Sequence, residues 1–477
     1  MRIKTEADRL LAMIREGRTM SAGQKVRLAV MLSVPAVVAQ LSSIVMQYID
    51  ASMVGSLGAE ASAAIGLVST TTWLFGGLLS AAASGFSVQV AHRIGAGDWE
   101  GAQRVLRQSV VAVLAFSLLL ASIGAGISSS LPVWLGGTES IHRDASTYFL
   151  IISLFLPALQ MQFLAGGMLR CSGNMHVPSM AGVAMCALDV VFNFLLIFPS
   201  RTVAVAGFDV FLPGAGLGVE GAALGTVLAE TVVVAWLLWY LRHGTSHLRI
   251  AGLRGWRQSI ADTLRKAVKI GFPMGLEHGV ICSAQIAITT IVAPLGVCSI
   301  AANSFAITAE SLCYMPGYGI AEAATTLVGQ SVGARRRDLT WSFAKITVGM
   351  GMAVMAVMGV LMYVAAPEII GLMTPVDEIR RLGVMALRIE AFAEPMFAAS
   401  IVAYGVCVGA ADTLKPCLMN FLSIWAVRLT MAAWLAPTMG LRGVWIAMCV
   451  ELTFRGAIFL VHLWRRRLYH PGLGPVL

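Results

Sequence analysis

Twelve apolar runs of membrane-spanning length constrain this sequence more than any other feature. A helix needs roughly 20 apolar residues to cross about 30 Å of hydrocarbon, and this chain is 57% hydrophobic and only 12% charged. Because a helix satisfies its own backbone hydrogen bonds in lipid, we predict an all-α membrane protein. The predicted spans are residues 28–54, 61–92, 106–129, 145–169, 177–199, 219–241, 264–293, 299–330, 340–365, 384–408, 415–437 and 442–464.

An internal repeat covers most of the chain. A shift of 238 residues places Pro35 on Pro273 and Pro157 on Pro395, and it holds one register through the first five spans of each half. About 16 extra residues near 200–216 then break the register, and we predict an outer loop there. Because six helices is an even number, the two copies enter the membrane from the same side. The repeat therefore predicts two homologous six-helix bundles around a central cleft.

The repeat and the spans define the predicted domains. They are a cytosolic amphipathic segment (1–27), an N-terminal lobe (28–241), a cytosolic linker (242–263), a C-terminal lobe (264–464) and a cytosolic tail (465–477). In the first segment Leu10, Leu11 and Ile14 share one helical face. No cleavage site follows a short apolar core there, so we do not predict a removable signal peptide.

The placement of positive charge predicts the orientation. The termini and the loops after even-numbered spans contain 25 of the 34 Lys and Arg residues, and the opposite loops contain five. By the positive-inside rule both termini are cytosolic, and we expect a multi-pass protein of the plasma membrane, in a bacterium the inner membrane. Insertion also explains the net charge of +9 better than nucleic-acid binding does.

The repeat contains motifs that resemble a known family. From Pro35 the spacing reads P-x14-D-x3-V-G-x-L-G and ends in R-I-G-A-G-D at 93–98. The second copy has G-F-P at 271–273, A-P-L-G at 293–296 and L-V-G-Q-S-V-G-A-R at 327–335. Further motifs are G-M-L-R-C-S-G-N at 167–174, L-G-V-E-G-A-A-L-G-T at 217–226 and V-G-A-A-D-T-L-K-P at 408–416. Together they resemble the multidrug and toxic compound extrusion (MATE) transporters over residues 28 to 465.

Polar residues in the first lobe are candidates for ion coupling. An ionisable group inside a span is a functional candidate because it costs free energy unless it faces a cavity or a partner. Asp50 lies fifteen residues after Pro35, which can act as a hinge in the same helix. Burial favours a protonated carboxylate, so protonation could change the packing of that helix. The alternative is an Asp at the wet outer interface.

Three further residues belong to this predicted ion-coupling site. Asp189 and Asn193 are four residues apart and share a helical face. The resembled family usually has Asn first and an acid or Asn second, so the order here is reversed. Thr226 matches a hydroxyl that the resemblance associates with the proton site. Depth along the helices places Asp50, Asn193 and Thr226 at a similar level, although each could instead bond only to backbone.

The second lobe contains acids near the predicted midplane. Glu277, Glu310 and Glu394 are candidates for binding a cation or a protonated amine. In Na⁺-coupled members of the resembled family a seventh-helix acid occupies the position of Ile281, so we expect H⁺ rather than Na⁺ coupling.

Arginines also lie inside the predicted spans of the second lobe. Arg428, Glu451 and Arg455 are interpreted as a structural ion cluster, or alternatively as neutralising Glu310 or Glu394.

We therefore predict a secondary active antiporter that exports organic, cationic or amphipathic compounds in exchange for H⁺ or Na⁺. Its partners are a small-molecule substrate and the lipid bilayer, and we expect no nucleic acid, no cofactor, no metal and a functional monomer. One alternative is a flippase for a lipid-linked or polyanionic substrate. An intramembrane enzyme is a remote alternative, since it would depend on the single pair His278 and Cys282.

Overall fold

The computed structural model describes residues 6–205, 208–245, 248–249 and 259–469. The first half contains α1 (Glu6–Arg15), α2 (Ala22–Gly55), α3 (Ala59–Gly95), α4 (Trp99–Ile127), α5 (Leu131–Trp134), α6 (Glu139–Leu154), α7 (Leu156–Cys171), α8 (His176–Ile197), β1 (Pro199–Val205), β2 (Phe208–Ala215), α9 (Gly218–Trp239) and the π-helical turn η1 (Tyr240–Gly244). The second half contains α10 (Ile260–Val292), the 3₁₀ turn η2 (Ala293–Leu295), α11 (Val297–Gly333), α12 (Arg337–Met373), α13 (Asp377–Glu390), α14 (Glu394–Gly409), α15 (Leu414–Leu422), the π-helical segment η3 (Ser423–Leu429), α16 (Thr430–Met439) and α17 (Leu441–Tyr469).

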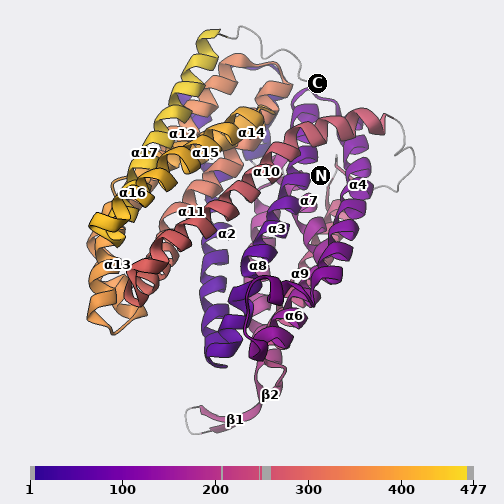
Figure 1. The fold of residues 1–477 in the computed structure, drawn as a ribbon. Coiled ribbons are helices and arrows are strands. Elements are labelled where there is room, and N and C mark those ends of the chain that lie inside the picture. The colour runs from indigo at the N-terminus through magenta and orange to yellow at the C-terminus, as the bar shows by residue number, and fades with distance from the viewer. Residues whose placement is uncertain (1–5, 206–207, 246–247, 250–258, 470–477) are drawn as a thin grey trace.

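The helix boundaries follow the sequence repeat. The shift of 238 residues maps both ends of α3 onto both ends of α11, and both ends of α7 onto both ends of α14. Figure 1 shows the resulting N-terminal lobe in indigo to magenta beside the C-terminal lobe in red to yellow. The two homologous six-helix bundles predicted from the repeat are therefore confirmed.

The number of spans agrees with the prediction once broken helices are joined. Among the described residues, nine single helices are long and apolar enough to cross a membrane, and two bent pairs raise the number to eleven. The twelfth is α11, the 37-residue repeat partner of α3, which contains the buried polar residues Asn303, Glu310 and Gln330. These polar side chains are buried in the protein rather than exposed to lipid.

Spans four and ten are broken, in contrast to the continuous helices predicted. The α6–α7 pair bends by 47° and the α13–α14 pair by 60°. In both pairs a proline, Pro157 or Pro395, lies in the first turn of the second helix. A proline lacks an N–H group, so it fits the start of a helix but interrupts a continuous one.

The predicted outer loop at 200–216 is wrong in detail, because most of it forms an antiparallel β-hairpin. Strand β1 pairs with β2, and Val203 lies opposite Val210. The β-branched residues of R-T-V-A-V, facing the F-D-V-F segment, favour strands over an irregular loop. The hairpin projects from one end of the bundle in Figure 1. We call this the hairpin end.

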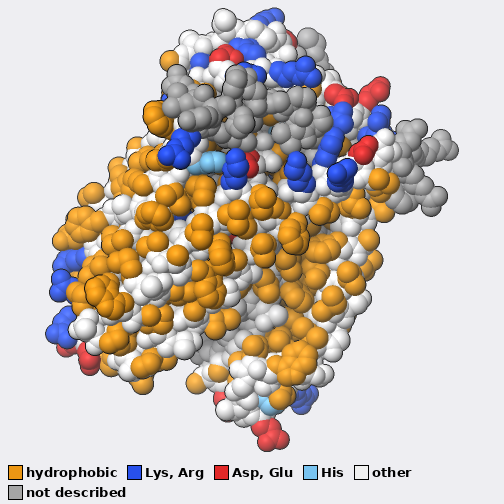
Figure 2. All heavy atoms as spheres, turned by 45° about the horizontal axis from the view of Figure 1, so that its top comes forward, with side chains coloured by type: hydrophobic (Ala, Val, Ile, Leu, Met, Phe, Trp, Pro, Cys, Tyr) orange, Lys and Arg blue, Asp and Glu red, His pale blue; other side chains and the backbone are white. Residues whose placement is uncertain are grey.

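Lys and Arg residues gather at the opposite end, above a belt of hydrophobic side chains (Figure 2). We call it the basic end. Helix α1 lies there with Leu10, Leu11 and Ile14 buried, as its sequence pattern predicts. Part of the predicted linker, 246–247 and 250–258, lies outside the described residues, as does 470–477 of the tail. The remainder of the linker includes the helical start of α10 at Ile260.

Helix α2 contacts both lobes, and its contacts with the C-terminal lobe lie on both sides of Pro35. Before the proline, Lys25 Nζ donates to Ser342 Oγ of α12 at 3.2 Å, and Leu28 packs in a cluster with α11 and α12. After it, Ala39 faces Gly182 of α8. The part of α2 after the predicted hinge also keeps contact with the C-terminal lobe, because Tyr48 Oη donates to the carbonyl oxygen of Thr308 in α11 at 2.7 Å.

The lobes are joined by paired hydrogen bonds at the basic end. His92 Nε2 of α3 lies 2.7 Å from the carbonyl oxygen of Gly409. Gln330 Nε2 of α11 donates to the carbonyl oxygen of Cys171 at 2.9 Å. The shift of 238 residues relates His92 to Gln330 and Cys171 to Gly409, so both lobes make the same type of contact.

Candidate functional site

The N-terminal lobe contains a cluster of two carboxylates and one amide, in which Asp189 and Asn193 are buried and Asp50 is partly buried. Asn193 Nδ2 donates to Asp50 Oδ1 of α2 and to Asp189 Oδ2 on its own helix, each at 3.0 Å. Asp189 is 0% exposed and Asn193 is 1% exposed. Three of the four residues predicted for ion coupling therefore meet, and the amide links both acids.

Helix register explains why these residues meet. Helices α2 and α8 pack side by side, with Ala39 facing Gly182 and Asp50 bonded to Asn193. In both contacts the two residue numbers differ by 143. This is expected for parallel helices, because each advances by the same distance per residue. Gly225 of α9 lies against Asn193, and a side chain there would overlap its amide. The glycine lets α9 approach the cluster.

Thr226 borders the cluster rather than joining it through a normal hydrogen bond. Its hydroxyl donates to the carbonyl oxygen of Ala222 in its own helix at 3.1 Å, although the side chain neighbours Asp189. Two further residues that the sequence analysis did not single out also adjoin the cluster, namely Tyr148 of α6 and Glu230 of α9. Glu230 could have been found, because it lies four residues after Thr226 inside a predicted span.

A cavity of about 360 Å³ lies between the two lobes and is lined by both of them. The N-terminal lobe contributes Gln40 and Arg170, and the C-terminal lobe contributes Glu277, Glu322 and Arg455. Cationic and acidic side chains therefore both line the cavity.

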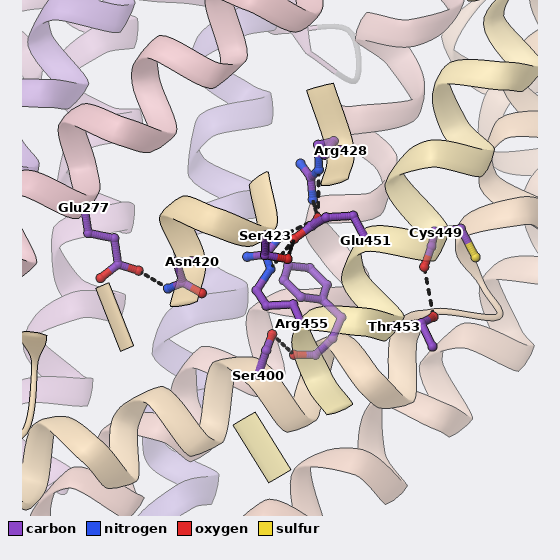
Figure 3. Close-up of polar contacts among 10 residues, drawn as sticks. Glu277, Ser400, Asn420, Ser423, Arg428, Cys449, Glu451, Thr453 and Arg455 are labelled. Atoms are coloured by element: carbon purple, nitrogen blue, oxygen red, sulfur yellow. Dashed lines mark hydrogen bonds and ion pairs between the residues drawn. The ribbon is translucent and has the colours of Figure 1, made fainter. Parts of the chain in front are cut away.

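Two lining acids already have partners. Arg170 Nε lies 3.7 Å from Glu322 Oε2. Glu277 Oε1 accepts a hydrogen bond from Asn420 Nδ2 of α15, as Figure 3 shows.

The three acids predicted for the second lobe do not form one site. Glu277 lines the central cavity, whereas Glu310 and Glu394 are not among its lining residues. Those two are 5% and 0% exposed and interact with each other and with Glu390 inside the C-terminal lobe. Glu390 was missed by the sequence analysis. It precedes Glu394 by four residues across the break between α13 and α14, which sequence did not reveal.

Glu451 is held by two arginines in the C-terminal lobe (Figure 3). Arg428 Nη2 lies 2.6 Å from Glu451 Oε2, and Arg455 Nε lies 2.8 Å from Glu451 Oε1. Ser423 Oγ donates to the same carboxylate at 2.5 Å. The geometry is that of the ion cluster inferred from sequence. Arg455 also lines the central cavity.

His278 lines the cavity and Cys282 does not. The imidazole packs edge-on against Trp73 at a centroid distance of 5.8 Å, and Cys282 is buried among the apolar residues of the C-terminal lobe. Over the part of the chain that the structure describes, no hydrogen bond joins the two side chains, and no group of three or more His, Cys, Asp or Glu could hold a metal ion.

The α3–α10 crossing separates the central cavity from a second, apolar groove of about 720 Å³. Leu78 of α3 and Phe272 of α10 line the groove, whereas Ser84 and Glu277 on the same helices line the cavity. Gly85 packs on the backbone of Ala267, so the two helices cross in close contact. Glu277 therefore faces the cavity side of this wall, and the groove is lined by apolar side chains apart from Ser283.

Twin membrane bundles with a shared cavity and buried carboxylates define a multi-pass membrane transporter. A family model described as MatE matches residues 35–195 and 273–434, once in each repeat. The chain therefore belongs to the MatE family, and it is a transporter rather than an enzyme.

Relatives and solved structures match this chain over almost its whole length. A probable multidrug resistance protein NorM from Thermotoga maritima is 23% identical over 91% of this chain and 92% of its own length. A probable multidrug resistance protein NorM from Idiomarina loihiensis is 26% identical over 91% of this chain and 93% of its own length. The fold matches a MOP superfamily transporter from Pyrococcus furiosus with a TM-score of 0.87, 20% identity and 98% of each chain covered. The fold also matches a variant of the Vibrio cholerae MATE transporter VcmN, with a TM-score of 0.86 and 17% identity. That match covers 94% of this chain and 98% of the other chain.

Proposed function

We propose that the chain is a secondary active antiporter that exports organic cationic or amphipathic compounds in exchange for inward H⁺. The observation that supports this most directly is the Asn193 amide joining Asp50 to Asp189 in the buried interior of the N-terminal lobe. Two carboxylates linked in this way interact strongly, so binding or release of one proton changes the charge of the whole cluster.

Helix α2, which contacts both lobes, links such a charge change to the C-terminal lobe. Asp50 belongs to the part of α2 after Pro35, which packs on α8 of its own lobe and also on α11 of the C-terminal lobe. Protonation of Asp50 would alter the packing of α2 against α8 and so the relation between the lobes. Alternating access then follows from the two bundles rocking about the central cavity.

Proton coupling is favoured over sodium coupling by the side chains present. Asp50 matches the first-helix acid of the resembled family, and the seventh-helix position used for Na⁺ is Ile281. One charge moved through about 100 mV supplies about 2.3 kcal/mol. A tenfold proton gradient adds about 1.4 kcal/mol.

The balance of charge in the cavity supports a cationic or amphipathic substrate. Glu277 accepts its hydrogen bond from the neutral amide of Asn420 and interacts with Arg455 only through space, whereas Arg170 faces Glu322 and Arg455 forms its ion pair with Glu451. A polyanionic or lipid-linked substrate would require uncompensated Lys or Arg in the lining. The flippase alternative is therefore not favoured.

The proposed orientation places the basic end and both termini in the cytosol of a plasma membrane, in a bacterium the inner membrane. The excess of Lys and Arg at that end supports it. We also propose that the functional unit is a monomer, because the cavity and the carboxylate cluster are both complete within one chain.

The experiment is transport by purified protein in liposomes, with pH and Na⁺ gradients imposed separately. Ethidium is the probe, because it is a fluorescent organic cation. A pH gradient alone is expected to drive ethidium exchange. Exchange that follows a Na⁺ gradient at fixed pH, and ignores a pH gradient, would reverse the choice of ion.

A further inference from the structure

Glu230 is a buried carboxylate in the middle of α9, with 7% of its surface exposed. None of the ion pairs formed by the described residues includes it. The contrast is Glu451, which is equally deep in the C-terminal lobe and is held by Arg428 and Arg455. A buried carboxylate without a cation is costly unless it is protonated or shares a proton.

Helix packing places Glu230 level with Asp189. Helices α8 and α9 are antiparallel, and Gly221 lies on the backbone of Leu196 while Gly225 lies on Asn193. Continuing this register by one turn brings residues 229 and 230 opposite Asp189. The electrostatic interaction of Glu230 with Asp189 agrees with that placement.

An acceptor without a hydrogen-bond partner also indicates that the carboxylate cluster holds a proton. Asn193 is 1% exposed, and its Oδ1 has no hydrogen-bond partner among the described residues, although its Nδ2 donates to two carboxylates. Asp189 Oδ1 also lacks a hydrogen bond of normal geometry. Buried acceptors of this kind are expected to have a donor. A protonated carboxyl group is one donor that the neighbouring side chains can supply, beside the hydroxyl groups of Thr226 and Tyr148.

Within the described part of the chain, the titratable neighbours of the cluster on the packed helices carry no positive charge. From the helices packed against α9, the titratable neighbours of the cluster are Asp50 of α2, Tyr148 of α6, and Cys186 and Asp189 of α8. Helices α3 and α7 pack here through apolar side chains such as Phe86, Leu164 and Met168. Three carboxylates therefore share one apolar region.

We propose that Glu230 is a third proton-holding carboxylate of the site, at the inner end of a relay whose outer end is Asp50. In each step one protonated carboxyl group gives its proton to a neighbouring carboxylate, so charge is conserved and no other reactant is required. This inference rests on the proposed proton coupling and extends it. Asp50 lies near the hairpin end of α2, and Glu230 lies one turn deeper, beside Asp189.

The test is ethidium–proton exchange in liposomes by wild type, Glu230→Gln, Glu230→Asp and the control Glu220→Gln. Glu220 lies in the first turn of the same helix, outside the cluster. Glu230→Gln is expected to lower the proton-to-ethidium ratio, measured from reversal potentials. It should also move the pH midpoint of exchange down by about one unit, because removing a neighbouring negative charge eases proton release from the remaining acids. The control should match wild type.

The outcomes separate this inference from the proposed function. Exchange by the wild type that ignores pH overturns proton coupling itself. Proton-driven exchange with the same midpoint and ratio in wild type and Glu230→Gln overturns only the role of Glu230. Glu230→Asp keeps an acid and is expected to recover most of the pH dependence. Recovery of folded protein without recovery of the pH dependence would indicate a purely structural residue.

Discussion

His92 and Gln330 occupy equivalent positions in the two repeats, and each bonds to a backbone carbonyl group at the end of a helix in the other lobe. Gly95 and Gly333, one turn later, let the α3 and α11 backbones approach closely. Because the pair lies at the basic end, opening of the protein at that end must break both hydrogen bonds. The repeat thus provides a symmetric closure made of two different side chains.

The first prediction follows from this closure. His92→Ala or Gln330→Ala should each shift the equilibrium toward opening at the basic end by about 0.5–1.5 kcal/mol, the net value of one hydrogen bond. That corresponds to a roughly two- to tenfold change in population. The measurement is labelling of Ser84→Cys, a cavity residue, by an impermeant maleimide added at the basic end. The background lacks the eight native cysteines.

Glu100→Ala is the control for this measurement, since Glu100 is exposed at the same end. Labelling rates of His92→Ala and Gln330→Ala that equal the control would show that the two bonds do not hold the closed state.

The second prediction concerns the two acids joined by Asn193. Asp50→Asn mimics the protonated side chain with almost no change in volume, so folding and ethidium binding should survive while pH-driven exchange is lost. Asp189→Asn should reduce exchange as well. Asn193→Asp in the Asp189→Asn background should restore part of it, because it returns the acid to the position usual in the resembled family.

Membrane expression is measured in parallel, because a misfolded variant would imitate a loss of function. Wild-type exchange by Asp50→Asn at normal expression would remove this residue from the mechanism. Glu277 in the cavity lining would then be the next acid to substitute.

Sequence predicted the elements that depend on local pattern and on the repeat. The spans follow from apolar length, and the meeting of Asp50, Asp189 and Asn193 follows from their similar depth in neighbouring helices. Register within a span is fixed by a rise of 1.5 Å per residue, so depth could be counted without a structure.

The direction in which a side chain points from its helix, toward the cavity or into its own lobe, could not be predicted in the same way. Glu277 and Glu310 lie at similar predicted depth, yet Glu277 lines the cavity and Glu310 points into the C-terminal lobe. That difference depends on the rotation of α10 and α11 about their axes, which is set by tertiary packing. The hairpin at 200–216 was missed because the interpretation treated the insertion only as extra length.

The third prediction concerns pH dependence outside the membrane. Asp98 begins α4, where its Oδ1 accepts from the Gly101 N–H at 2.8 Å and its Oδ2 lies 2.7 Å from Arg93 Nη1. Partial burial alone would raise the pKa of Asp98, but these bonds outweigh that effect and hold the pKa below its ordinary value. The charged form therefore stabilises the fold above the unfolded pKa of about 3.9, and this stabilisation is lost as the pH falls through the folded pKa.

Asp98→Asn keeps an acceptor at the helix start and removes the charge. Thermal unfolding of the purified protein between about pH 3 and pH 6 should show a smaller acid-induced loss of stability for this variant than for wild type. Equal acid sensitivity in both proteins would contradict the role given to the Asp98 carboxylate.

The fourth prediction concerns orientation and follows from the unequal Lys and Arg distribution. With the basic end in the cytosol, an impermeant thiol reagent outside intact cells should label Ser200→Cys on β1 and miss Glu100→Cys in the first turn of α4. Both positions are exposed, so accessibility is matched. The reverse pattern would invert the topology.

The last prediction concerns α1, which lies where the lobes meet. Leu11 and Ile14 are 1% and 0% exposed and pack in a cluster with α11, α12 and α14 of the C-terminal lobe. The Leu11 side chain also contacts Gly173, and Arg15 lies 5.3 Å from the ring centroid of Trp99, both in the N-terminal lobe. A helix that bridges both lobes should favour their closed arrangement at this end.

Leu11→Ala is therefore expected to weaken the docking of α1, because truncation of a buried leucine costs about 2–5 kcal/mol where the site cannot collapse. Hydrogen exchange of the α1 backbone should become faster, and maleimide labelling of Ser84→Cys from the basic end should rise with it. Arg9→Ala is the matched control, since Arg9 lies on the exposed face of the same short helix. Faster hydrogen exchange in α1 with no rise in the labelling of Ser84→Cys would show that α1 packs on the closed end but does not stabilise the closed state.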